Sequence, residues 1–80
     1  MRILVIEDEP QLARHVTSAL TRHGHLASAR HDGAEGLRAL KKQEPDLVFL
    51  DLQMPGMDGI ETLRRLRETH PDLTVIIMTA

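Results

Sequence analysis

Four short apolar runs recur along the chain at intervals that suit strands separated by helices. They cover residues 2–6, 26–30, 47–51 and 73–79, and most of their positions are aliphatic or β-branched, as is typical of strands. The second run is weaker because it contains small residues, so we expect it at an edge of the sheet. The third run holds four consecutive apolar residues and ends at Asp51, which predicts a central strand buried on both faces.

Between these runs, apolar residues recur at helical spacing. The apolar stripes are Leu12, Val16, Ala19 and Leu20 in the first helix, Leu37 and Leu40 in the second, and Ile60, Leu63 and Leu66 in the third. Asp32 with Glu35, and Asp58 with Glu61, each place an aspartate three residues before a glutamate, which is a pattern of helix N-termini. Gly24 follows the first stripe and is expected at the C′ position of that helix.

The regular alternation of strands and helices predicts an α/β fold with a parallel sheet and right-handed crossovers. The chain has 80 residues, which allows one small domain with a marginal core. Hydrophobic residues make up 41% and charged residues 28%, as in an ordinary globular domain. The absence of cysteine excludes a disulfide framework and a thiolate metal site, and it fits a reducing compartment.

Charge and the first residues of the chain argue against two further classes of protein. The net charge of -2 does not resemble that of a basic nucleic-acid-binding surface. The first apolar run reaches Glu7 after only four apolar residues, which is too short for a signal-peptide core or a membrane span. We therefore expect a cytoplasmic protein without a membrane partner.

The last apolar run is followed by no segment that would cover it or pair with it. A long apolar strand at the edge of a sheet is a pairing hazard that proteins usually cover. We therefore expect either that the sequence is truncated or that a partner supplies the missing layer. Our specific hypothesis is that the chain associates with itself through the exposed strand at residues 73–78.

Acidic residues follow two of the predicted strands. Glu7 and Asp8 follow the first strand, and Asp51 ends the third. If these strands are neighbours at the switch point of a doubly wound sheet, their ends lie about 4.8 Å apart and the carboxylates converge. Carboxylates that repel one another favour a cation, and hard oxygen ligands suit Mg²⁺. The backbone carbonyl of Gln53 would add another oxygen.

Simpler roles remain open for the same acids when each is considered alone. Glu7 and Asp8 would also stabilise the N-terminus of the following helix. Asp51 would also serve as a loop aspartate that caps a turn.

Four segments of the chain, in the same order, closely resemble the receiver domain of two-component response regulators. They are residues 3–10, 32–33, 50–59 and 75–80. The resemblance implies a flavodoxin-like, doubly wound parallel sheet of the 2-1-3-4-5 type. It also implies phosphorelay signal transduction, in which a sensor histidine kinase donates a phosphoryl group.

The resemblance assigns roles to individual residues. Asp51 would be the phospho-acceptor, while Glu7 and Asp8 would form the acidic pocket, with Asp8 the nearer to Mg²⁺. The carbonyl of Gln53 would be a further metal ligand. Thr79 would be the switch hydroxyl that turns toward the aspartyl phosphate, beside the small residue Ala80. Such a protein catalyses at most its own phosphorylation and dephosphorylation, so we do not expect a stand-alone enzyme.

The end of the chain departs from the family pattern. Residues 1–80 correspond to the N-terminal part of a receiver domain, with four strands and three helices, and the final helices and fifth strand have no counterpart. The family's lysine after the fifth strand is also absent. We expect the parent protein to be a transcription regulator that binds DNA only through an output domain outside this sequence.

The alternative to a phospho-accepting switch is a truncated module that has lost the switch and acts only by association between chains. A small Mg²⁺-dependent phosphohydrolase would need a further acid or base after Asp51, and a dinucleotide-binding protein would need a glycine-rich loop after the first strand. The strip at Arg64, Arg65 and Arg67 is expected to be a solvated face, with Glu61 and Glu68 spaced to pair with Arg65 and Arg64.

Overall fold

The computed structural model describes residues 1–54 and 58–78. The elements are β1 (Arg2–Ile6), α1 (Pro10–Arg22), β2 (Leu26–Arg30), α2 (Gly33–Lys42), β3 (Leu47–Asp51), α3 (Gly59–Thr69) and β4 (Thr74–Met78). The predicted alternation of strands and helices is therefore confirmed. α1 has 13 residues, and no helix in the described part of the chain is long and apolar enough to cross a membrane.

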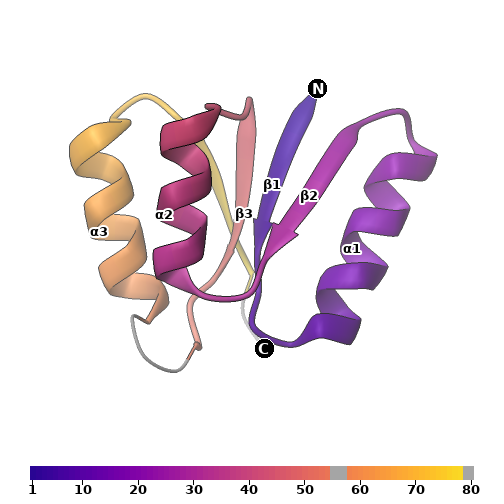
Figure 1. Ribbon diagram of the computed structural model, residues 1–80, viewed down its shortest axis with the longest axis horizontal. Helices are drawn as coiled ribbons and strands as arrows, with labels where there is room; N and C mark the ends of the chain where they lie inside the picture. The colour runs from indigo at the N-terminus through magenta and orange to yellow at the C-terminus, as the bar shows by residue number, and fades with distance from the viewer. Residues whose placement is uncertain (55–57, 79–80) are drawn as a thin grey trace.

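All four strands are parallel and form one sheet in the order β2-β1-β3-β4. The chain runs from β1 outward to β2, and then crosses back over β1 to β3 and continues to β4. This reversal is the switch point of a doubly wound sheet, and it lies between β1 and β3. Figure 1 shows α1 on one face of the sheet, with α2 and α3 side by side on the other. The predicted flavodoxin-like arrangement is confirmed.

The main hydrophobic core lies between the sheet and the α2–α3 layer. Its fully buried members are Ile6, Val48, Leu50 and Leu66, which have 0% exposure. Ile3 and Val5 point to the opposite face, where Ala13 of α1 is buried with them. β1 is thus buried on both faces, as expected for an interior strand of a parallel sheet.

Helix ends follow the capping patterns of the sequence. The carboxylates of Asp32 and Asp58 accept hydrogen bonds from the backbone N–H groups of Glu35 and Glu61, both at 2.8 Å. Gly24 has a φ of 89°, a conformation that suits glycine after the end of a helix. Each of these local predictions is confirmed.

Two residues of the predicted apolar stripes are exposed, so their predicted place in the core is wrong. Ile60 is 61% exposed and Leu12 is 44% exposed. Leu66 of the α3 stripe is buried as predicted, and Thr62 takes the buried place expected for Ile60; both Thr62 and Leu66 are fully buried. Thr62 tolerates burial because its hydroxyl donates a hydrogen bond to the carbonyl of Asp58 at 2.8 Å, so no polar group is left unsatisfied.

Candidate metal site

Three carboxylates meet where β1 and β3 end. Ile6 and Leu50 are partners in the β1–β3 register, so the residues that follow them begin side by side. Glu7, Asp8 and Asp51 each offer a carboxylate oxygen within 4.8 Å of the other two. Glu7 is 3% exposed and Asp51 is 7% exposed, while Asp8 is half-buried. The convergence expected from the acids at the strand ends is present in the structure.

Neighbouring backbone fixes the position of Glu7. Its N–H donates to the carbonyl of Arg30 at 3.0 Å, which extends the β1–β2 pairing by one residue. Its carboxylate accepts a hydrogen bond from the N–H of Glu9 at 2.9 Å. The Nδ1 atom of His31 lies 3.1 Å from the Glu7 carbonyl oxygen. The edge strand and the loop before α1 therefore both orient this acid.

Glu9 links the acidic site to the start of α1. Its own carboxylate accepts hydrogen bonds from the N–H groups of Gln11 at 3.0 Å and Leu12 at 2.7 Å, so Glu9 is the N-cap of the helix. Pro10 follows as the first helical residue, a position that needs no backbone donor. One residue thus caps the helix with its side chain and holds Glu7 with its backbone.

Asp51 is held by the loop that follows it. The N–H of Gln53 donates to Oδ1 of Asp51 at 2.9 Å. The N–H of Leu52 lies 3.4 Å from the carbonyl oxygen of Met78 in β4, and the N–H of Gly59 donates to the carbonyl of Leu52 at 3.2 Å. The loop is therefore tied to both β4 and the first residue of α3.

Gly59 is required by the close approach of α3 to this loop. A Cβ atom at position 59 would come closer than 3.0 Å to the backbone of Leu52 and to the carbonyl oxygen of Asp51. Backbone atoms cannot yield as a flexible side chain can, so only glycine fits here. This contact joins segments whose approach depends on how α3 meets the end of β3, so no pattern in the sequence indicates it.

The acids open into a hollow of about 360 Å³. It is lined by Glu7, Asp8, Glu9, Leu12, Asp51, Gln53 and Met78. Since a water molecule occupies roughly 30 Å³ in the liquid, the hollow has room for a hydrated cation and a small anion. Leu12 was expected in the core, but it instead forms an apolar wall of this hollow together with Met78.

The electrostatics of the site favour a cation. The pKa of Glu7 is raised to about 7, and burial is the largest cause. Contacts with Asp8 and Asp51 also raise this pKa, while the hydrogen bond from the Glu9 N–H lowers it. The donor set is composed of hard oxygen ligands with open space beside them, which fits Mg²⁺ in chemical type.

Two residues of the predicted site lie outside the described residues. These are Thr79, the expected switch hydroxyl, and the adjacent Ala80. Gln53 is described: it is exposed and lines the hollow. His31 is exposed, and its ring contacts the backbone carbonyl of Glu7.

Comparison with known proteins gives a consistent family. The model of the response regulator receiver domain matches residues 3–80. The transcriptional regulatory protein TcrA of Mycobacterium tuberculosis is 39% identical over all 80 residues, which cover 32% of its length. The DNA-binding response regulator MtrA of Mycolicibacterium smegmatis is 44% identical over 57 residues, or 71% of this chain and 25% of that protein. The chain therefore spans about a quarter to a third of these two relatives.

A solved structure extends the similarity to three dimensions. The response regulator protein TrrA of Thermotoga maritima superposes with a TM-score of 0.94 at 34% sequence identity. The match covers 99% of this chain and 69% of that chain. That structure is of TrrA in complex with Mg²⁺ and BeF.

The raised pKa of Glu7 predicts a pH dependence of stability in the metal-free protein. Between pH 4.5 and about 7 the unfolded chain has released the Glu7 proton and the folded chain has kept it, so this residue makes the free energy of unfolding fall as pH rises. We expect Glu7→Gln to remove this slope and to raise stability at pH 8 by on the order of 2 kcal/mol. Urea unfolding in EDTA at several pH values would measure both.

The control for this experiment is Asp72→Asn, because Asp72 is exposed and forms no hydrogen bond or ion pair with the described residues. This variant should keep the wild-type slope. If the free energy of unfolding depends on pH in the same way in Glu7→Gln and in wild type, the prediction that the buried Glu7 charge destabilises the fold is wrong.

The packing of Gly59 predicts that Gly59→Ala damages both the fold and the site. We expect a loss of about 1–3 kcal/mol in the free energy of unfolding from overpacking, and weaker binding of Mg²⁺ because the loop after Asp51 must shift. Urea unfolding and titration with Mg²⁺ followed by NMR would measure the two effects.

Gly24→Ala is the control. Nothing lies within 4 Å of the Cβ atom that it adds, but the φ of 89° at this position is unfavourable for alanine. This variant should therefore lose stability and keep wild-type Mg²⁺ affinity. Equal affinities in the two variants would contradict the prediction.

Proposed function

Because the chain belongs to the response regulator receiver domain family, we propose that it accepts a phosphoryl group on Asp51 with the help of Mg²⁺. The observation that carries this proposal is the convergence of Glu7, Asp8 and Asp51 within 4.8 Å at the switch point of the sheet. Ligands of doubly wound folds bind at this place. Receiver domains are phospho-acceptor switches of two-component phosphorelays, so the site and the family agree.

The proposed chemistry is the transfer of a phosphoryl group between two side chains. A carboxylate oxygen of Asp51 attacks the phosphorus of a phosphohistidine on a sensor histidine kinase. The new P–O bond forms an acyl phosphate, the P–N bond breaks, and the histidine leaves with the electron pair. Bound Mg²⁺ supplies positive charge that offsets the charge on the phosphoryl oxygens. The N–H of Gln53 orients Asp51 for this attack through its bond to Oδ1.

The other residues of the site have supporting roles in this proposal. Glu7 and Asp8 would hold the ion together with Asp51, and Asp8 is the more exposed of the first two. The backbone carbonyl of Gln53 is a further ligand, supported by the position of Gln53 in the lining of the hollow. Thr79 provides the switch hydroxyl. The protein turns over no substrate beyond its own phosphate.

The parent protein is proposed to be a transcription regulator. Relatives such as TcrA and MtrA carry regulatory names and are three to four times as long as the matched segment. Binding of DNA would belong to an output domain outside these 80 residues. The cytoplasmic location expected from the sequence stays a prediction.

A second candidate function is association between two copies of the chain through β4. This strand lies at the edge of the described sheet, so one row of its backbone groups is free to pair. Ile76 is 42% exposed and Ile77 is 39% exposed, and successive strand residues point to opposite faces. Both faces next to the open edge are therefore apolar, which favours a second copy that adds a strand and covers these side chains.

Phosphorylation of the purified chain tests the first function. We expect acetyl phosphate or a phosphoramidate to add one phosphoryl group in Mg²⁺ and none in EDTA, as measured by intact mass. Asp51→Asn should remain unmodified, because it lacks the attacking oxygen. The matched control is Asp72→Asn. Asp72 is an exposed acid and is distant in sequence from the acids of the hollow, so this variant should be modified like wild type.

A labile phosphate could escape detection by mass, so binding of beryllofluoride with Mg²⁺ is measured by NMR as a second readout. We expect shifts at Asp51 and Gln53 in the wild type only. A folded protein that neither gains mass nor binds beryllofluoride would contradict the proposal, as would an Asp51→Asn variant that is still phosphorylated.

Light scattering across a range of concentrations tests association through β4. We expect oligomers of the wild-type chain and a shift toward monomer in Ile76→Lys, because a charge at the proposed interface opposes its burial. Leu26→Lys is the control, since Leu26 is 67% exposed on the opposite edge strand. A well-dispersed wild-type monomer at high concentration would rule out this function.

A further inference from the structure

A groove runs between α2 and α3 on the outer surface of the helical layer. Its volume is about 420 Å³, and its lining includes Ala34, Leu37, Arg38, Lys41, Arg64 and Arg65, together with one acid, Glu68, which pairs with Arg64. Ala34 and Leu37 are half-buried, and the four basic residues are exposed. The groove therefore combines an apolar floor with a rim of net positive charge. It shares no lining residue with the acidic hollow.

The charge of this layer is opposite to that of the whole chain. The helices α2 and α3 carry six of the ten basic residues, which are Arg38, Lys41, Lys42, Arg64, Arg65 and Arg67. Against these they hold three acids, Glu35, Glu61 and Glu68. The whole chain has a net charge of -2. A positive surface on an acidic protein attracts acidic partners selectively.

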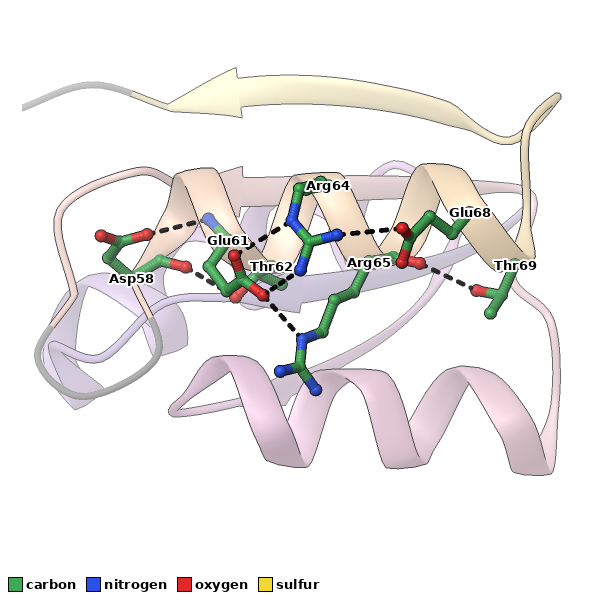
Figure 2. Close-up of polar contacts among 7 residues, drawn as sticks. All are labelled: Asp58, Glu61, Thr62, Arg64, Arg65, Glu68 and Thr69. Atoms are coloured by element: carbon green, nitrogen blue, oxygen red, sulfur yellow. Dashed lines mark hydrogen bonds and ion pairs between the residues drawn. The ribbon is translucent and has the colours of Figure 1, made fainter.

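The acids of α3 organise its arginines without covering all of them. Arg64 donates to both Glu61 and Glu68, and Arg65 donates only its Nε atom to Glu61 at 2.8 Å. The predicted pairs of Glu61 with Arg65 and Glu68 with Arg64 are thus confirmed. Figure 2 shows the terminal nitrogens of Arg65 pointing away from α3 with no dashed line to them. These two nitrogens form no hydrogen bond with residues 1–54 and 58–78.

This geometry leaves Arg65 ready to bind a carboxylate. Hydrogen bonds from Arg64 and Arg65 lower the pKa of Glu61 to about 2. Glu61 therefore stays ionised at neutral pH and continues to accept the hydrogen bond from Nε of Arg65. The two free nitrogens form the fork that matches a carboxylate in two parallel hydrogen bonds. Across the groove, Arg38 and Lys41 of α2 form no ion pair with any described residue.

We propose that the α2–α3 groove binds an acidic amphipathic helix of a partner protein. Aliphatic side chains of the partner would cover Ala34 and Leu37, and its carboxylates would meet Arg65, Arg38 and Lys41. This is the helix-in-groove mode of recognition, with charge complementarity selecting the partner. A single-stranded nucleic acid fits less well, because its bases need aromatic platforms. The chain has one aromatic residue, Phe49, and it lies in β3.

Binding of a synthetic helical peptide tests the proposal. The probe has leucines along one face and glutamates at the flanking positions, and a second peptide replaces each glutamate by lysine. We expect the acidic peptide to bind wild-type protein at low ionic strength and to weaken as salt is added. NMR shifts should concentrate at Ala34, Leu37 and Arg65.

Matched variants then locate the contact. We expect Lys41→Glu to weaken binding of the acidic peptide roughly fivefold, equivalent to about 1 kcal/mol. Arg22→Glu is the control, because Arg22 lies in the last turn of α1 as Lys41 does in α2. The two reversals therefore disturb a helix C-terminus alike, and Arg22→Glu should keep wild-type affinity. Circular dichroism confirms that each variant is folded.

Several results would overturn the proposal. One is equal binding of the acidic and lysine peptides, which would indicate unspecific apolar contact. Another is equal loss of affinity in Arg22→Glu. Absence of binding to folded wild-type protein would also overturn it, as would a single-stranded oligonucleotide that shifts the groove residues while the peptide does not. None of these results depends on phosphorylation at Asp51, because the groove and the hollow have separate linings.

Discussion

Parallel pairing of β1 with β3 is the constraint on which the rest of the structure depends. The register joins Ile6 to Leu50, so the next residues of both strands emerge together. The apolar side chains of these strands fill the core, and their carboxyl ends carry the acids. A shift of β1 by one residue in this register would turn Ile6 to the opposite face of the sheet and move Glu7 away from Asp51. Hydrophobic packing thus sets the geometry of a charged site.

The acidic site is costly to the fold and is held by its surroundings. Burial is the largest of the effects that together raise the pKa of Glu7 to about 7, which means that the ionised form is disfavoured in the folded protein. The bonds that hold the acids come largely from the backbone: Arg30 and Glu9 fix Glu7, and Gln53 fixes Asp51. The carboxylates of Glu7 and Asp51 are therefore held by backbone groups whose positions depend on the sheet and on the start of α1.

Much of the fold and part of the site could be predicted from the sequence. The apolar run before Asp51 and the capping aspartates Asp32 and Asp58 are local signals, and the structure bears them out. Helical stripes were less informative, because Thr62 is buried in place of Ile60. Threonine counts as a polar residue in a sequence pattern. When its hydroxyl donates to a backbone carbonyl of the same helix turn, as in Thr62, the side chain can be buried like an apolar one. The tight contact of Gly59 with Leu52 could not be predicted, since it depends on how α3 meets the end of β3.

The exposed position of Leu12 gives the acidic hollow a property that a count of carboxylates would miss. Together with Met78, this side chain places hydrocarbon rather than water along one wall of the hollow. Hydrocarbon polarises weakly, so the electric field of the acids is screened less on that side than in open solvent. The same three charges on a fully wet surface would attract a counter-ion less strongly. A leucine that contributes little to the core therefore helps to set the local dielectric in which the carboxylates act.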